Sequence, residues 1–239
     1  MKNITAYKNP NSPITEAYRN IRTNLEFSNI DKEIKTIVVT SSKQNEGKTT
    51  VVSNLGVSFA ALENKKILIL DADLRNPSVH RAFDISNTNG LTDVLKGSKT
   101  YAECVKKTKI ENLHVLTTGT MPPNPSELLN SNKMRSFVEE LKSHYDYIFI
   151  DTPPIAIVTD ASVVSTYADG VIMVVGAKEV DVDMAKIAKE RLDKVNANIL
   201  GAIMNKYSAD NGSYGYYNYY YEQQDTSRRG RRNKKKRLK

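Results

Sequence analysis

Residues 36–49 read Thr36-Ile-Val-Val-Thr-Ser-Ser-Lys-Gln-Asn-Glu-Gly-Lys-Thr49, an apolar β-branched run that leads straight into Gly47-Lys48-Thr49. The run predicts a buried strand, and the periodic pattern of residues 49–62 predicts a helix after it. A strand, a loop ending in Gly-Lys-Thr and a helix form the context of the P-loop pattern G-x-x-x-x-G-K-[ST]. Ser42 stands where that pattern has its first glycine. The stretch therefore predicts a phosphate-binding loop on an α/β sheet.

The predicted loop has the chemistry for a nucleotide and its metal ion. Successive backbone N–H groups and the N-terminus of the following helix surround phosphate oxygens. Lys48 would place a positive charge on the outer phosphates, and the Thr49 hydroxyl can ligate Mg²⁺. The expected nucleotide-binding residues are Ser42, Lys43, Asn45, Glu46, Gly47, Lys48, Thr49 and Thr50.

Further strands and helices alternate along the chain. Apolar runs at 66–71, 147–151, 170–176 and 199–204 predict strands, and helical patterns at 133–144, 160–167 and 182–195 lie between them. Continuous apolar runs are typical of strands buried on both faces of a parallel sheet. The fold class we expect is therefore α/β, a doubly wound, mainly parallel sheet flanked by helices, followed by a disordered C-terminal tail.

Three segments of the chain differ in composition. Residues 1–30 contain an amphipathic helix that begins at Ser12-Pro13, and we assign them as an N-terminal part of the main domain. Residues 31–206 carry the alternating strands and helices. Residues 207–239 are rich in Gly, Ser, Asn, Tyr and basic residues, which predicts a flexible tail.

Two of the predicted strands end in acids. Asp71 and Asp73 follow the apolar run Ile67–Leu70, and Asp151 follows Tyr147–Ile150. Carboxylates at the carboxyl ends of buried strands project into the crevice where open α/β sheets bind ligands. Beside a P-loop, these acids favour a magnesium site, and one of them could orient or deprotonate an attacking hydroxyl.

Composition excludes several other classes of protein. The formal net charge is +8, but residues 228–239 hold nine Lys or Arg, so the remaining chain is at −1. A block of like charge is usually disordered and solvated, and it can also contact nucleic acid, anionic lipid or an acidic partner. No apolar run approaches the roughly 20 residues of a membrane helix, and the N-terminus does not read as a secretory signal. The single cysteine, Cys104, allows no internal disulfide, and His80, His114 and His144 lack metal-ligand spacing.

The motifs together resemble those of the bacterial tyrosine kinases of capsule and exopolysaccharide synthesis, which are related to the MinD/ParA ATPases. Residues 42–49 resemble the Walker A motif of this family. Asp71-Ala-Asp73-Leu-Arg75-Asn-Pro77 resembles its distinctive Walker A′ motif, and Phe149-Ile-Asp151-Thr-Pro-Pro154 its Walker B motif. The resemblance covers most of residues 12–221 and includes a terminal tyrosine cluster.

The resemblance implies roles for the site residues. Lys48, Asp71 and Asp73 would be catalytic, with Asp71 as the base toward the tyrosine hydroxyl. Thr49, Asp71 and Asp151 would form the metal site for Mg²⁺. The loop departs from the family pattern Pro-Gly-Glu-Gly-Lys by having Gln44-Asn45, although asparagine tolerates a positive φ. Lys43 stands where the MinD/ParA ATPases carry a signature lysine; we interpret it as a loop charge.

Glu16, Arg19 and Arg22 recur every three residues on the first predicted helix and form one slanted stripe. The stripe could be a solvated face with an ion pair. The pattern E-x-x-R-x-x-R also resembles the subunit-contact motif of the family, and on that resemblance we expect a ring-like homo-oligomer.

Six tyrosines fall within eight residues of the tail: Tyr214, Tyr216, Tyr217, Tyr219, Tyr220 and Tyr221. With a basic block behind them, they could stack on single-stranded nucleic acid. Next to an ATP site, we instead expect them to be phospho-acceptors, and a nucleic-acid partner is disfavoured. Phosphotyrosines would offset the basic block, since each brings a charge of about −1.5 to −2.

The sequence therefore predicts an ATP- and Mg²⁺-dependent protein-tyrosine autokinase that phosphorylates its own tail. Two alternatives remain open: a MinD/ParA-like partitioning or positioning ATPase, and a regulatory nucleotide-binding scaffold. The resemblance further implies a separate membrane-embedded activator, a cognate tyrosine phosphatase, and a cytoplasmic location at the inner face of the membrane.

Overall fold

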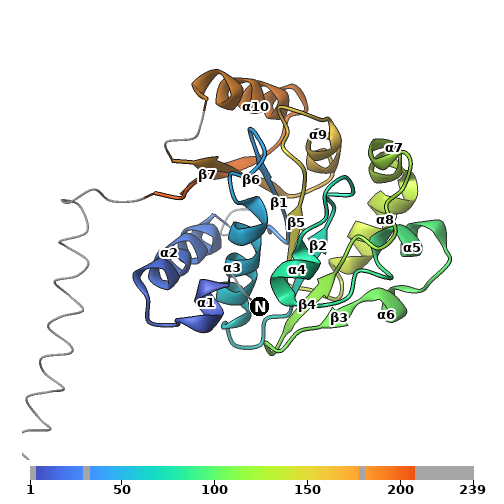
Figure 1. Ribbon diagram of the computed structural model, residues 1–239, viewed down its shortest axis with the longest axis horizontal. Coiled ribbons are helices and arrows are strands. Elements are labelled where there is room, and N and C mark those ends of the chain that lie inside the picture. The colour runs from blue at the N-terminus through green and yellow to red at the C-terminus, as the bar shows by residue number, and fades with distance from the viewer. Residues whose placement is uncertain (1–3, 29–32, 178–180, 208–239) are drawn as a thin grey trace, which may run out of the picture. The chain divides into compact units, whose positions relative to one another are not determined.

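The computed structural model describes residues 4–28, 33–177 and 181–207. One compact unit spans Met1–Lys206 (Figure 1). Of the predicted tail 207–239, residues 208–239 lie outside the described residues, and they include the tyrosine cluster and the basic block. The assignment of 1–30, 31–206 and 207–239 as separate segments stays a prediction.

A seven-stranded sheet forms the centre of this unit. Its order is β3-β4-β2-β5-β1-β6-β7. All neighbouring strands are parallel except β3, which runs antiparallel to β4. The strands are β1 (Thr36–Ser41), β2 (Ile67–Asp71), β3 (Lys106–Lys107), β4 (Leu113–Leu116), β5 (Tyr147–Asp151), β6 (Gly170–Gly176) and β7 (Ile199–Asn205). The predicted α/β fold with a mainly parallel sheet is confirmed.

Helices cover both faces of the sheet (Figure 1). They are α1 (Thr5–Lys8), α2 (Pro13–Phe27), α3 (Lys48–Ala60), α4 (Val79–Phe83), α5 (Leu91–Lys96), α6 (Tyr101–Cys104), α7 (Pro125–Asn130), α8 (Asn132–Leu141), α9 (Asp160–Ser165) and α10 (Val182–Lys194). Each long crossover between parallel strands thus contains at least one helix, as is usual for parallel pairs.

Two hydrophobic cores lie on opposite faces of the sheet because successive strand residues point to opposite sides. Ile37 and Val39 of β1 face a core shared with α1 to α4. Val38 faces the other core, which α5 to α10 cover. Phe59 of α3 is fully buried and packs edge-on against Tyr147 and Phe149 of β5. The β1, β2 and β5 strands are buried throughout, as predicted.

The prediction that every strand is buried on both faces is wrong for β7. This strand lies at the edge of the sheet, and its residues are half-buried or exposed, with Met204 64% exposed. An edge strand has a neighbour on one side only, so part of its surface reaches solvent.

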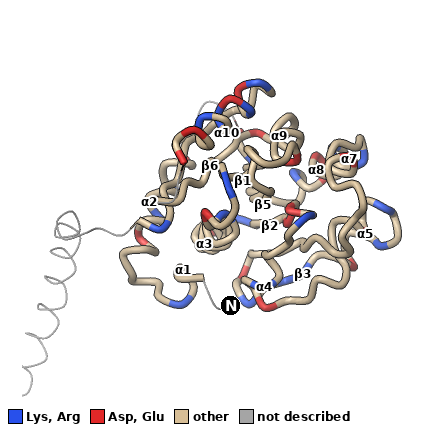
Figure 2. The backbone as a smooth tube through the Cα atoms, turned by 45° about the horizontal axis from the view of Figure 1, so that its top comes forward, with Lys and Arg blue, Asp and Glu red and all other residues tan. Residues whose placement is uncertain are grey.

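The predicted amphipathic helix corresponds to α2. The Ser12 side chain accepts a hydrogen bond from the Thr15 N–H, and Pro13 occupies the first turn. Tyr18 and Leu25 are buried against α3 and the sheet. Charges of both signs lie along the outer helix α10 in Figure 2, whereas β2 and β5 are apolar until their last residue, an aspartate in each.

The site is positioned by the strand order. Because β1 lies between β5 and β6, the chain leaves β1 at the point where the winding of the sheet reverses. Open α/β sheets bind ligands in the crevice outside the carboxyl ends of the strands at such a point. The loops after β1, β2 and β5 meet there.

Candidate active site

The loop between β1 and α3 is held by one buried carboxylate. Glu46 is fully buried, and its Oε2 accepts hydrogen bonds from the Ser42 hydroxyl and the Lys43 N–H, both at 2.9 Å. Its Oε1 accepts from the Gly176 N–H at the end of β6, at 3.1 Å. Asn45 adopts the left-handed conformation, with a φ of 65°. The asparagine therefore supplies the positive φ expected of it.

Gly47 is required by its surroundings as well as by its backbone. Its φ is 92°, and a Cβ at this position would lie 2.1 Å from Nδ2 of Asn205. That same Asn205 amide donates a hydrogen bond to the Glu46 carbonyl at 2.8 Å. The end of β7 therefore closes over the loop, and only glycine fits beneath it.

Thr49 and Asp151 are joined behind the loop. The Thr49 hydroxyl donates to Oδ2 of Asp151 at 2.6 Å and lies 2.7 Å from the Ser78 hydroxyl. Oδ1 of Asp151 is buried and has no hydrogen-bond partner. A buried carboxylate oxygen without a partner is costly, so this atom is suited to accept a water molecule or a cation.

Asp71 and Asp73 hold the loop that follows β2. Oδ2 of Asp71 accepts from the N–H groups of Ser78 at 3.2 Å and Val79 at 3.1 Å, at the start of α4. Oδ1 of Asp73 accepts from the Asn76 N–H at 2.9 Å. Asp71 is fully buried, whereas Asp73 is 8% exposed. Both acids are therefore oriented by backbone donors.

Burial raises the pKa of all three acids. Desolvation and the nearby Asp151 carboxylate hold the pKa of Asp71 well above its ordinary value. Desolvation raises the pKa of Asp151 to about 6, against the opposing Lys48 charge and the Thr49 hydrogen bond. The pKa of Asp73 is also raised by burial, although its backbone hydrogen bonds and Lys48 act in the opposite direction. A bound cation would relieve this concentration of negative charge.

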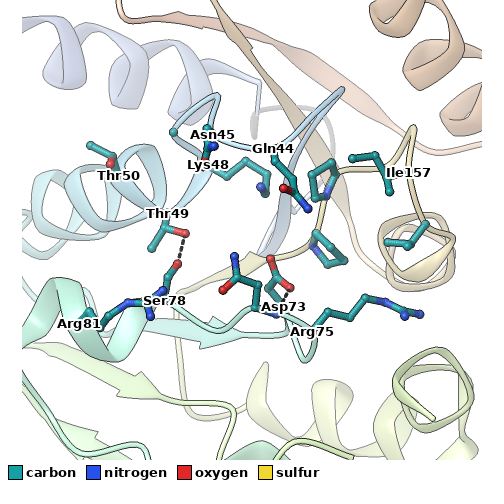
Figure 3. A pocket seen from close by; sticks show the side chains of 15 residues that line it. Gln44, Asn45, Lys48, Thr49, Thr50, Asp73, Arg75, Ser78, Arg81 and Ile157 are labelled. Carbon is teal, nitrogen blue, oxygen red and sulfur yellow. Dashed lines mark hydrogen bonds between the residues drawn. The ribbon is translucent and has the colours of Figure 1, made fainter. Parts of the chain in front are cut away.

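A cavity of about 230 Å³ opens in front of these groups (Figure 3). Its lining consists of Gln44, Asn45, Gly47, Lys48, Thr49, Thr50, Asp73, Arg75, Asn76, Ser78, Arg81, Pro153, Pro154, Ile157 and Val158. Ser42 and Glu46 are buried behind the loop. Asp71 and Asp151 lie behind the lining, joined to it through Ser78 and Thr49.

The cavity also includes residues to which the sequence interpretation gave no role. Arg75, Asn76, Ser78 and Arg81 come from the segment after Asp73, and residues 153–158 follow Asp151. Their position directly after the two acid-terminated strands was the available signal. The sequence did not show that these two segments form opposite sides of one cavity.

Arg75 is held in place by another buried acid, Asp160. Its Nε and Nη2 donate to the two oxygens of Asp160 at 2.8 and 3.0 Å, and Nη2 also donates to the Ser126 hydroxyl at 3.0 Å. Asp160 is fully buried at the start of α9. A bidentate arginine–carboxylate pair fixes the guanidinium plane as well as its charge.

The residues fit Mg²⁺. This ion prefers oxygen ligands and usually keeps several waters, with one or two carboxylates and substrate phosphates completing its shell. The Thr49 hydroxyl and the partnerless Asp151 oxygen provide such ligands. Among the described residues, no group of three or more His, Cys, Asp or Glu has the arrangement of an all-protein metal site.

The stripe on α2 is partly engaged within the chain. Arg19 pairs with Glu16 at 2.8 Å and donates to the Pro10 carbonyl at 3.0 Å. Arg22 donates from Nη1 to the Ser58 carbonyl of α3 at 2.5 Å. Oligomerisation through these residues stays a prediction.

Comparison with known proteins agrees with this geometry. Residues 34–201 match the family model AAA_31, described as an AAA domain. A relative from Staphylococcus aureus, the putative tyrosine-protein kinase CapB, is 42% identical over 216 residues, which are 90% of this chain and 94% of that protein. The chain belongs to the bacterial tyrosine-protein kinase family.

Solved structures support the same assignment. The chimerical protein CapA2B2 is 36% identical, with a TM-score of 0.84 over 87% of this chain and 92% of the matched one. The septum site-determining protein MinD from Pyrococcus horikoshii, solved with Mg-ADP, is 26% identical, with a TM-score of 0.63 over 74% and 72% of the two chains. The predicted tyrosine-kinase family and its relation to MinD are confirmed.

The chain is therefore a tyrosine-protein kinase with a P-loop fold. No helix in the described part of the chain is long and apolar enough to cross a membrane. The roles assigned to individual residues, including the tail tyrosines, stay predictions.

Proposed function

We propose that this chain transfers the γ-phosphoryl group of ATP to tyrosine hydroxyls, including the tail tyrosines Tyr214–Tyr221 of a neighbouring copy, and so regulates capsular or exopolysaccharide synthesis. The observation that supports this most is the convergence of Lys48, Thr49, Asp73 and Ser78 on one cavity at the carboxyl edge of the sheet. Asp71 and Asp151 lie directly behind its wall.

The chain's own groups would hold the phosphates. The loop amides and the N-terminus of α3 surround the β- and γ-phosphates, and Lys48 neutralises charge on the transferring group. Thr49, Asp151 and, behind them, Asp71 form the metal side of the site. Mg²⁺ held by Thr49 and Asp151 would offset the negative charge of the phosphates during transfer. Positioning and electrostatics then account for most of the catalysis.

Two acids serve the acceptor tyrosine in this mechanism. Asp73 borders the cavity and orients the incoming hydroxyl. Asp71, which lies behind the Ser78 and Thr49 side of the cavity, receives its proton as the base that the family resemblance implies. It can do so only in its ionised form. Burial raises the pKa of Asp71, and bound Mg²⁺ would act in the opposite direction by favouring the carboxylate. The phenolic oxygen then forms the new bond to phosphorus as the bond to the ADP oxygen breaks.

The assembly around the kinase is also proposed. A ring-like homo-oligomer would bring the tail of one copy to the site of the next, with Glu16, Arg19 and Arg22 at the contact. A separate membrane-embedded activator would hold the kinase at the inner face of the membrane, and a tyrosine phosphatase would reverse the modification.

A second function has an observation in its favour. The likeness to MinD with Mg-ADP supports a nucleotide-driven ATPase in which water, not tyrosine, accepts the phosphoryl group. The identity to that protein is lower than to the tyrosine kinase relatives, so we favour the kinase.

One experiment separates these functions. Purified chain is incubated with Mg-ATP, phosphotyrosine is mapped by mass spectrometry, and released phosphate is measured in parallel. Tail phosphotyrosine that disappears in Lys48→Met supports the kinase. Release of phosphate without phosphotyrosine supports the ATPase, and the absence of both in the presence of bound nucleotide supports a regulatory scaffold.

A further inference from the structure

One side of the cavity is unlike the rest. Most of its lining is polar, but Pro153, Pro154, Ile157 and Val158 form a continuous apolar lip. Ile157 is 49% exposed, although Ile155, two residues earlier, is fully buried. A phosphate group gains nothing from an isoleucine. An exposed apolar side chain at the edge of a polar cavity therefore suits a different part of a ligand.

The lip is held in place by hydrogen bonds. The Ile155 N–H donates to the Ser41 carbonyl at 2.9 Å, and the Arg191 guanidinium donates to the Ile155 carbonyl at 2.6 Å. The Ile157 and Val158 N–H groups both donate to the Pro154 carbonyl, at 3.1 and 3.3 Å. The turn is thus fixed to the end of β1, and Ile157 stays at the cavity edge.

A flat cation lies on the same side of the cavity. In Figure 3, Arg75 and Ile157 lie toward one edge, with Lys48 and Asp73 further in. The Arg75 guanidinium is held by Asp160 and Ser126, so its plane is fixed before any ligand arrives. Guanidinium groups stack on aromatic rings, and apolar side chains pack against the opposite ring face.

We propose that Ile157, Pro154 and Arg75 form the subsite for the aromatic ring of the acceptor tyrosine, with its hydroxyl directed toward Asp73 and Lys48. This inference rests on the proposed kinase function and adds the residues that select an aromatic acceptor. A serine or threonine side chain would leave the lip and the guanidinium face uncovered.

The occupant is the tail of a neighbouring copy of this chain. Its six tyrosines begin at Tyr214, seven residues beyond the last described residue, Tyr207. Glu222 and Asp225 follow the cluster closely, and Arg75 and Arg81 both line the cavity. The aromatic rings match the lip, and the acids match the charge of Arg81, since Asp160 already neutralises Arg75.

The test measures transfer to a peptide in trans. The full chain carries Phe at the six tail positions, and a peptide of residues 212–225 is the acceptor. Ile157→Ser is expected to raise KM for the peptide about tenfold, the loss of one apolar contact surface. Ile157→Leu keeps an apolar side chain and should have a KM close to that of the parent chain. The control Ile187→Ser, on α10 and 38% exposed, should match the parent chain.

Binding measurements separate the possible failures. If the parent chain transfers no phosphate, the proposed function fails, and the subsite is judged by anisotropy of a labelled peptide in Mg-ADP. The subsite is supported if the peptide Kd is about tenfold weaker for Ile157→Ser and unchanged for the other variants.

The subsite proposal is overturned if all variants have equal Kd and KM values for the peptide. It is also overturned if Ile157→Ser weakens only the binding of fluorescent ADP, or changes the oligomer mass measured by light scattering, because Ile157 would then contact the nucleotide or another subunit.

Discussion

Replacing Asp151 by Asn should make the nucleotide-free protein more stable and the nucleotide-bound protein less so. Asp151 is fully buried with one partnerless oxygen, and burial raises its pKa from the ordinary 3.8 to about 6. Each pKa unit is worth about 1.4 kcal/mol, so the ionised carboxylate costs the native state about 3 kcal/mol above pH 6. The Asn amide has an unpaired N–H of its own, which reduces the expected gain to about 1–2 kcal/mol.

The pH dependence follows from the sign of the pKa change. Because the native pKa is raised, the folded protein binds more protons than the unfolded chain between about pH 4 and pH 6. Wild-type stability therefore falls as pH rises through this window, while the Asn variant lacks that contribution. The gain in free energy of unfolding from Asp151→Asn should be small near pH 4 and should reach its full value above pH 6.

Urea unfolding followed by far-UV circular dichroism at pH 4.5, 5.5 and 7.5 measures these differences; the chain has no tryptophan to report by fluorescence. Glu190→Gln, an exposed acid on α10, serves as the control and should show a difference near zero. Adding Mg-ATP at about 100 times Kd should stabilise the wild type by about 2.7 kcal/mol and the variant by much less. A variant that is less stable at pH 7.5 without ligand, or a difference that does not change with pH, would refute the reasoning.

Other substitutions test other parts of the structure. Asp169→Asn should lower the free energy of unfolding by about 2 kcal/mol at pH 7, because Asp169 accepts from the Thr36 N–H and hydroxyl and pairs with Lys142. Burial opposes ionisation of Asp169, but these partners outweigh it and lower its pKa. The stability difference between the wild type and Asp169→Asn, followed by thermal unfolding, should therefore shrink as pH falls below about 4. Gly47→Ala should weaken nucleotide binding at least tenfold, since the backbone is left-handed and the new Cβ meets the Asn205 amide. In the double variant with Asn205→Ala, titration with a fluorescent nucleotide should show recovery of only that part of the lost affinity that is due to the clash. Full recovery of the affinity would show that the positive φ of residue 47 costs nothing.

The long elements and the site acids could be predicted because they carry strong local signals. The runs 37–39, 67–70 and 147–150 are apolar throughout, and their burial on both faces follows from a central place in a parallel sheet. The loop at 42–49 was placed by its residue types alone. Short elements such as β4 and α4 to α7 gave no periodic signal, because a helix of four to six residues spans barely one turn.

The sequence by itself determined that a P-loop, two acid-terminated strands and a tyrosine-rich tail belong to one chain, because those signals lie within a few consecutive residues. Only the tertiary structure decided how distant segments meet. It placed Asn205 over Gly47, Asp160 on Arg75 and Ile157 at the cavity edge. It also placed β7 at the sheet edge, where its apolar residues are partly exposed. Such contacts depend on strand order and crossover geometry, and these are set by packing of the whole sheet rather than by neighbours along the chain.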